Sequence, residues 1–207
     1  KFYHQALAME ARVWVRRPDR YAMEFDFSGR KKGYAWIFPK KDHLNVGLYR
    51  LEAGSGFNRG ALEAYIQTRL KSVLRVGTVR GFPICFGNTG TPPGLGRILL
   101  AGDAAGLAEP LFGEGIYFAL KSGQAAANAV IGSIRRGQSA PLTGYARLLR
   151  PMFLDQRLHA LGTQLLYRFP TPSFYVARQP WLNQWFSRSY ASGRPLSYLL
   201  YGARFTS

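Results

Sequence analysis

Residues 97–123 constrain the fold more than any other part of the sequence. An apolar run at 97–101 predicts a buried strand that ends at Gly102 and Asp103. A loop with several glycines follows, and residues 115–136 have the length and alanine content of a long helix. In open α/β sheets, ligands bind where a strand leaves the sheet. This order of elements therefore predicts a ligand site beside Asp103.

The residue types in this loop suit a flat, hydroxylated ligand with an anionic part. The Asp103 carboxylate can accept hydrogen bonds from sugar-like hydroxyls. Gly106, Gly113 and Gly115 have no Cβ, so their backbone can approach a flat ligand closely. The N-terminus of the predicted helix offers N–H groups and a partial positive charge, which stabilise an anionic ring as they stabilise a phosphate. The alternative interpretation is a Gly-Asp turn that has only a packing role.

The first half of the chain is predicted to form an antiparallel sheet. Runs rich in Val, Phe, Tyr and Trp alternate with short polar turns. These runs lie at residues 6–15, 21–27, 33–38, 43–49 and 76–86. In the third run, Tyr34, Trp36 and Phe38 alternate and so face one side of the sheet. Apolar residues at helical spacing predict one helix, over 59–74.

The second half is predicted to be helical after the glycine loop. Apolar spacing predicts a helix over 142–167, which Pro151 divides or kinks. We expect Glu114 in the first turn of the preceding helix, where the dipole favours a carboxylate, rather than in an acid/base pair with Glu109. The predicted regions are a sheet with one helix (1–96), a ligand-binding half-domain (97–140) and a helical, aromatic-rich tail (141–207).

Composition excludes several classes of protein. Of the 207 residues, 47% are hydrophobic and only Cys85 is a cysteine, which excludes a disordered chain and a disulfide scaffold. The three histidines are scattered, so we expect no metal site. No apolar run of about 18 residues predicts a spanning helix. The chain begins within a predicted strand and without a signal-peptide pattern, so we expect a C-terminal piece of a longer protein.

Positive charge is concentrated in the tail. The formal net charge is +17, and residues 135–207 contain ten arginines and one acid, Asp155. Arginines among aromatic residues suit an anionic membrane or nucleic acid, whereas the simplest alternative is a solvated basic surface. Aliphatic runs at 161–166 and 196–201 favour the membrane. We therefore expect a cytoplasmic protein with peripheral membrane contact through 141–207, and no nucleic-acid partner.

Two segments resemble one family of flavoenzymes. Residues 102–117, GDAAGLAEPLFGEGIY, resemble the second FAD-binding motif of the geranylgeranyl reductase family. Residues 33–40, GYAWIFPK, with NVG at 45–47, resemble that family's landmark in the substrate-domain sheet. The motifs stand in the family's order and separation, and the resemblance spans residues 6–150. It implies the C-terminal part of a p-hydroxybenzoate hydroxylase-like flavoprotein, of mixed α+β and α/β class.

The resemblance implies particular residues for cofactor and substrate. Asp103 would accept a hydrogen bond from the ribityl chain of FAD, and the backbone of 110–115 would lie against the isoalloxazine ring. The implied cofactor-binding residues are Gly102, Asp103, Gly106, Pro110, Gly113, Glu114, Gly115 and Ile116. The implied substrate-binding residues are Tyr34, Trp36, Phe38, Pro39 and Phe112. Phe112 and Glu109 differ from the family's usual residues, which puts the substrate in question more than the cofactor.

The implied activity is reduction of carbon-carbon double bonds in a prenyl group. Reduced FAD would supply the hydride, with NAD(P)H or another reductant as electron donor, and no residue is identified as the proton donor. The family's Gly-x-Gly-x-x-Gly turn for the FAD pyrophosphate does not occur in these residues, so we expect the isolated chain to bind FAD weakly and to be inactive. The alternatives are a flavin-dependent monooxygenase of the same fold, acting on an aromatic or quinone-like substrate, and a non-catalytic lipid- or membrane-binding fragment.

Overall fold

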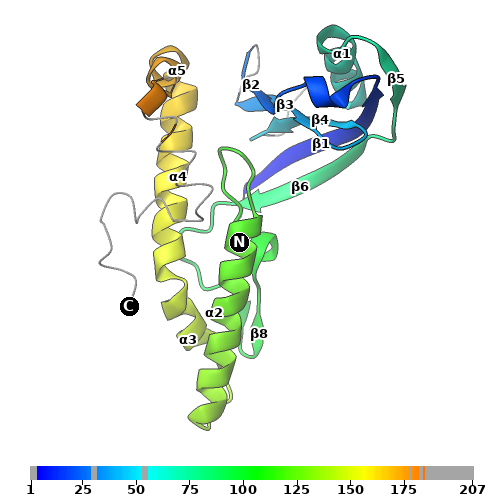
Figure 1. Ribbon diagram of the computed structural model, residues 1–207. Helices are drawn as coiled ribbons and strands as arrows, with labels where there is room; N and C mark the ends of the chain where they lie inside the picture. The colour runs from blue at the N-terminus through cyan, green and yellow to red at the C-terminus, as the bar shows by residue number, and fades with distance from the viewer. Residues whose placement is uncertain (1–3, 29–31, 53–55, 178, 182–183, 185–207) are drawn as a thin grey trace. The chain divides into compact units, whose positions relative to one another are not determined.

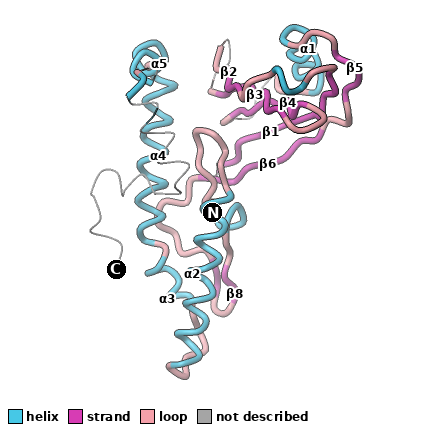
Figure 2. The backbone as a smooth tube through the Cα atoms, viewed as in Figure 1, coloured by secondary structure: helices cyan, strands magenta, loops and turns pink. Residues whose placement is uncertain are grey.

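The computed structural model describes residues 4–28, 32–52, 56–177, 179–181 and 184. The chain divides into two compact units. The first, the sheet unit, is Gln5–Ile84, and the second, the helical unit, is Cys85–Ser207 together with Lys1–His4. Figure 1 labels the elements of both units, and Figure 2 separates their helices from their strands by colour.

The sheet unit is built on an antiparallel sheet, as predicted. Its strands are β1 (His4–Val15), β2 (Glu24–Asp26), β3 (Gly33–Pro39), β4 (Leu44–Arg50), β5 (Val73–Val76) and β6 (Arg80–Phe86). The order is β2-β3-β4-β1-β5, and β6 also pairs with β1. A short 3₁₀ turn, η1 (Pro18–Arg20), joins β1 to β2. The strand predicted over 21–27 is shorter than expected because only Glu24–Asp26 pairs with β3.

One face of this sheet packs against α1 (Arg59–Arg69). Pairing of Ile37 with Val46, and of Val46 with Ala11, aligns alternate apolar side chains on that face. These side chains form a core with Leu62 and Ile66 of the helix. The core fixes the register of β3, because a slip of one residue would move every apolar side chain to the other face.

The helix predicted over 59–74 ends earlier than expected. Asn58 caps its start by accepting a hydrogen bond from the N–H of Ala61 at 3.0 Å. The helix ends at Leu70, whose backbone is extended, and Ser72 then takes a positive φ of 57°. Leu74 lies in β5 and is 61% exposed. Pairing of β5 with β1 overrides the helical spacing that includes Leu74.

The helical unit contains the predicted long helix and a divided second helix. Its elements are β7 (Gly94–Leu95), β8 (Ile98–Leu99), the 3₁₀ turn η2 (Gly102–Ala105), α2 (Ile116–Arg135), α3 (Leu142–Leu148), α4 (Arg150–Arg168) and α5 (Pro170–Ala177). Pro151 lies in the first turn of α4, where its missing N–H costs no intrahelical hydrogen bond. The predicted division at Pro151 is therefore confirmed.

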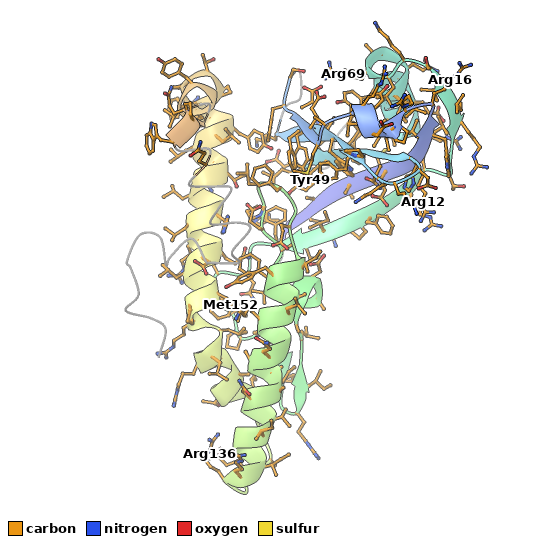
Figure 3. All side chains as sticks on the ribbon, in the orientation of Figure 1. Arg12, Arg16, Tyr49, Arg69, Arg136 and Met152 are labelled. Carbon is orange, nitrogen blue, oxygen red and sulfur yellow. The ribbon has the colours of Figure 1, made fainter. Side chains whose placement is uncertain are left out.

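Small residues on α2 allow the helices of this unit to pack closely. Ala125 and Ala129 belong to the same buried cluster as Tyr145 and Met152, and Met152 is labelled in Figure 3. The hydroxyl of Tyr145 also donates a hydrogen bond to the carbonyl of Leu100 at 2.7 Å. This bond ties α3 to the segment that leads into η2.

The buried strand predicted over 97–101 is wrong. Only Ile98–Leu99 is extended, and it pairs antiparallel with β7 in a two-stranded sheet. Ile98 is 66% exposed, because no other strand of the described residues pairs with β8 and covers it. The predicted aliphatic run at 196–201 lies outside the described residues.

Replacing Gly47 by alanine is expected to lower the free energy of unfolding by about 3 kcal/mol, the upper end for an overpacked site. An added Cβ would overlap the indole ring of Trp36. The matched control is Gly81→Ala, where the Cβ would meet only the carbonyl oxygen of Ala8, at 3.8 Å. Urea unfolding followed by circular dichroism measures both variants. Equal stability of the two would contradict the packing of Trp36 over Gly47.

Candidate functional site

A buried carboxylate shapes the loop before α2. Glu109 is 0% exposed, and its carboxylate accepts hydrogen bonds from the N–H groups of Leu111 at 2.5 Å and Phe112 at 2.8 Å. The backbone N–H of Glu109 donates to the carbonyl of Glu114 at 2.7 Å, and its carbonyl accepts from the N–H of Gly113 at 2.9 Å. The side chain and the backbone of Glu109 therefore bind residues 111–114 and close this loop.

Helix α4 supports the loop from a distant part of the sequence. Nδ1 of His159 lies 3.3 Å from Oε1 of Glu109, and Nε2 of Gln156 donates to the carbonyl of Leu107 at 2.5 Å. Burial, and then the charge of Glu109, raise the pKa of Tyr167 above its ordinary value. Two side chains of α4, Gln156 and His159, thus contact the loop or the residues that lead into it.

The sequence analysis did not identify Gln156 and His159. They lie three residues apart on α4, and the buried Thr163 follows His159 by four residues, so the three share one face of the helix. Polar side chains at this helical spacing are the signal that indicates a role here. Their partners, Leu107 and Glu109, are about fifty positions earlier in the chain, beyond the reach of local pattern rules.

The turn η2 positions Asp103 against the start of α2. The N–H of Gly102 donates to Oγ of Ser122 on α2 at 2.9 Å, and Ser122 donates in turn to the carbonyl of Phe118 at 2.6 Å. η2 ends at Gly106, whose positive φ of 67° is the left-handed conformation that glycine adopts without strain. Asp103 is therefore held by hydrogen bonds on both sides of its own position.

Asp103 is available to a ligand. Burial raises the pKa of its carboxyl above the ordinary value, and within the described residues no hydrogen bond or ion pair satisfies that carboxylate. A Cβ built on Gly115 would lie 2.8 Å from Oδ1 of Asp103. The carboxylate thus lies directly beside the N-cap of α2, at a position where any side chain at residue 115 would displace it.

Glu114 caps α2 from outside the helix. The helix begins at Ile116 with Gly115 as N-cap, so Glu114 precedes the first turn in which we expected it. Its Oε1 accepts a hydrogen bond from the N–H of Tyr117 at 2.9 Å. The predicted reason for an acid at this position still applies, because the carboxylate lies at the positive end of the helix and satisfies a helical N–H.

The predicted cofactor residues lie in one continuous segment, from η2 to the first residue of α2. Asp103 lies in η2, Gly106 ends that turn, and Gly115 is the N-cap of α2. Between them, Gly113 takes a positive φ of 69°. Ile116 is 75% exposed. Their contacts with a cofactor remain predictions.

Three of the five predicted substrate residues form an aromatic layer on the sheet. Trp36 lies between Tyr34 and Phe38, with ring centroids 6.0 Å from each. Tyr49 of β4, labelled in Figure 3, extends the layer, 5.1 Å from Tyr34. Nε1 of Trp36 donates to Oδ1 of Asn45 at 2.6 Å, which fixes the indole.

Two predicted substrate residues do not belong to this layer. Strand alternation places Pro39 on the opposite face of β3, with Ala35 and Ile37. Phe112 belongs to the helical unit, where its N–H binds Glu109. Substrate contact by either residue remains a prediction.

In the part of the chain that the structure describes, no group of three or more His, Cys, Asp or Glu side chains is placed to bind a metal ion. Nor does any helix of that part combine the length and apolar character needed to cross a bilayer.

No protein-family model matches the chain. It is 37% identical over 111 residues to geranylgeranyl diphosphate reductase of Synechocystis sp., which covers 52% of this chain and 27% of that protein. It is 34% identical over 129 residues to digeranylgeranylglycerophospholipid reductase of Methanococcus vannielii, covering 58% of this chain and 32% of the relative. The chain therefore spans less than a third of the length of these relatives, and the predicted resemblance to geranylgeranyl reductases is confirmed.

Solved structures show the fold. A geranylgeranyl bacteriochlorophyll reductase-like protein from Thermoplasma acidophilum superposes with a TM-score of 0.68 at 22% identity, over 79% of this chain and 44% of that one. The flavin-dependent brominase Bmp2 superposes with a TM-score of 0.59 at 20% identity, over 89% and 50%. The chain has the mixed α+β fold of these flavoproteins, and the predicted p-hydroxybenzoate hydroxylase-like class is confirmed.

Asp103→Asn is expected to stabilise the ligand-free chain at pH 7 but not at pH 3. A carboxyl with a raised pKa holds its proton more tightly in the folded state, so it reduces stability as the pH rises from below the ordinary Asp value through the raised folded value. An asparagine side chain does not titrate in this range, so it adds no pH dependence to the stability. The melting temperature of the variant should therefore match that of the unchanged chain at pH 3 and exceed it at pH 7.

Asp26→Asn is the control, with the opposite sign. Despite burial, hydrogen bonds from Ser28 and then Tyr65 lower the pKa of Asp26, so its ionised form stabilises the fold at neutral pH. This variant should melt below the unchanged chain at pH 7. A destabilising effect of Asp103→Asn at pH 7 would contradict the described environment of Asp103.

Proposed function

We propose that this chain is part of an FAD-dependent oxidoreductase that reduces carbon-carbon double bonds of a prenyl group, such as geranylgeranyl. Relatives named as reductases of geranylgeranyl compounds support the reaction, and flavin-dependent neighbours support the cofactor. One observation carries the site: the Asp103 carboxylate lies against the glycine N-cap of α2 and has no hydrogen-bond or ion-pair partner in the described residues.

The residues at this site fit FAD. An unsatisfied carboxylate suits a ribityl hydroxyl, which would donate a hydrogen bond to it. Glycines at 113 and 115 leave the adjacent backbone uncovered for contact with a flat ring. When bound, FAD supplies the redox chemistry, and the protein supplies binding, orientation and electrostatics. The remaining predicted cofactor residues, Gly102, Gly106, Pro110, Glu114 and Ile116, belong to the same segment.

Each element of the site would have a separate task. Asp103 would hold the ribityl chain, and the loop closed by Glu109 would orient the ring. The start of α2 would favour negative charge at the pyrimidine edge, as a helix N-terminus does. The aromatic layer of Tyr34, Trp36 and Phe38 would bind the apolar prenyl chain and exclude water from it. A reductant such as NAD(P)H is proposed as the electron donor, and the chain offers no assigned residue for it.

We propose a separate role for each of the three regions predicted from the sequence. Residues 1–96 would bind substrate, 97–140 would bind flavin and 141–207 would contact a membrane. The turn expected for the FAD pyrophosphate does not occur in these 207 residues, so we propose that the isolated chain binds FAD weakly and is inactive alone. The alternative of a flavin-dependent monooxygenase has the same fold; the names of the sequence relatives favour the reductase.

Exposed apolar side chains support membrane contact by the end of the helical unit. Six such residues on and after α4 are each at least half exposed: Leu161, Leu165, Phe169, Tyr175, Val176 and Trp181. Aromatic and aliphatic side chains beside arginines are typical of helices that lie at an anionic membrane interface. We therefore propose a cytoplasmic protein that binds the membrane peripherally, where prenyl lipids are found.

The reaction is tested with the whole protein that carries this chain, reduced anaerobically with its flavin. Addition of a geranylgeranyl lipid is expected to reoxidise the flavin and to increase the lipid mass by about two daltons for each bond reduced. Trp36→Ala should slow this reoxidation while Leu74→Ala, an exposed site on β5, should not. A flavin that stays reduced until oxygen is admitted would contradict the reductase and favour the monooxygenase.

A further inference from the structure

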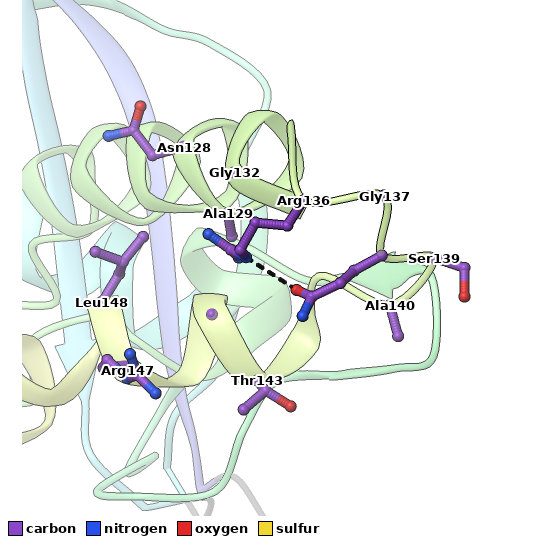
Figure 4. Close-up of a pocket in the computed structure, with 12 residues that line it drawn as sticks. Asn128, Ala129, Gly132, Arg136, Gly137, Ser139, Ala140, Thr143, Arg147 and Leu148 are labelled. Atoms are coloured by element: carbon purple, nitrogen blue, oxygen red, sulfur yellow. Dashed lines mark hydrogen bonds between the residues drawn. The ribbon is translucent and has the colours of Figure 1, made fainter. Parts of the chain in front are cut away.

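A groove lined by arginines lies where α2 ends and α3 begins. It has a volume of about 840 Å³, and its lining includes Arg136, Ser139, Thr143 and Arg147 (Figure 4). A second cavity, of about 490 Å³, is lined by Arg147, Arg150 and Arg157. Because Thr143 and Arg147 line both, the two cavities form one basic surface, which we call the arginine groove.

Glycines let the guanidinium of Arg136 lie close to the helix backbones. A Cβ built on Gly132 would lie 3.1 Å from Nη1 of Arg136, and one built on Gly144 would lie 3.9 Å from Nη2. Nε of Arg136 donates to Oε1 of Gln138 at 3.0 Å (dashed line in Figure 4). The guanidinium is exposed to solvent, and its hydrogen bond to Gln138 holds it beside the groove.

No acid in the described residues neutralises this surface. Neither cavity is lined by Asp or Glu. Asp155 is the only acid in residues 135–177, and it is 2% exposed. Within the described residues, no ion pair is formed by Arg136, Arg147, Arg150 or Arg157. Like charges gathered on one surface without counter-charges favour an anionic ligand.

The side chains of the groove favour phosphate among anions. A guanidinium presents paired N–H donors that match two oxygens of a phosphate, and the hydroxyls of Ser139 and Thr143 add further donors. Phe153 is the only aromatic residue in the lining of either cavity, and it is 6% exposed. Without exposed aromatic rings the groove has no surface on which nucleic-acid bases would stack.

We propose that the arginine groove binds a phosphate group, carried by a lipid headgroup or by a free phosphate compound. The groove lies at the α2–α3 end of the helical unit, whereas the exposed apolar residues proposed to contact a membrane lie on the later part of α4 and beyond it (Figure 1), so the proposal adds a separate anionic ligand to this unit. It needs neither the flavin nor the reduction of a double bond. Its test is therefore independent of the proposed reductase activity.

The test compares two double variants that lose the same charge. Arg136→Gln with Arg147→Gln changes the arginine groove, whereas Arg16→Gln with Arg80→Gln changes two exposed arginines of the sheet unit; Arg16 and Arg136 are labelled in Figure 3. Binding of the full chain is measured by co-sedimentation with phosphatidylcholine vesicles with and without phosphatidic acid, and by calorimetric titration with pyrophosphate. Sodium chloride at matched ionic strength is the blank, because exposed charges are screened by salt.

The groove variant is expected to weaken binding by about tenfold or more, and the control variant by less than about twofold. Weakening toward vesicles alone supports a lipid headgroup, and weakening toward pyrophosphate as well supports a free phosphate compound. Equal weakening by the two double variants, or no binding of the unchanged chain to either probe, overturns the proposal.

A single variant keeps the test decisive if the double variant folds poorly. Arg147 makes no hydrogen bond or ion pair within the described residues, so Arg147→Gln removes no structural contact there. It should weaken binding several-fold, and Arg147→Lys, which keeps the charge but loses the paired donors, should be intermediate. Unchanged binding by Arg147→Gln at an unchanged melting temperature also overturns the proposal.

Discussion

Burial of the Glu109 carboxylate is the interaction on which the candidate site depends. A buried carboxylate requires hydrogen-bond partners, and here the backbone N–H groups of Leu111 and Phe112 donate to it while Nδ1 of His159 lies 3.3 Å away. These bonds hold residues 109–114 in a closed loop directly before α2.

Helix α4 supports the candidate site and also carries part of the proposed membrane contact. This helix lies in the region predicted as a membrane-contacting tail, yet Gln156 and His159 brace the loop and the segment before it, while residues further along are exposed and apolar. One helix would therefore serve two purposes, with its buried polar face supporting the flavin loop and its exposed end facing lipid.

Local rules predicted much of the fold. Alternating aromatic residues, glycine turns and a proline inside an apolar pattern predicted the sheet, the long helix α2 and the break before α4. The same rules failed where pairing with distant residues decides the structure. Leu74 lies in a strand because its neighbours Val73 and Arg75 pair with β1, and Ile98 is exposed because no described strand covers β8. The contact of His159 with Glu109 was missed for the same reason, since it joins segments far apart in the sequence.

The affinity of Asp103→Asn for FAD, measured in the whole protein that carries this chain, tests the central claim most directly. Asparagine keeps the size of the side chain and removes the charge that strengthens a hydrogen bond from a ribityl hydroxyl. The account predicts a dissociation constant raised about tenfold or more, although the ligand-free variant is no less stable at neutral pH. An unchanged dissociation constant would contradict the assignment of Asp103 to the flavin.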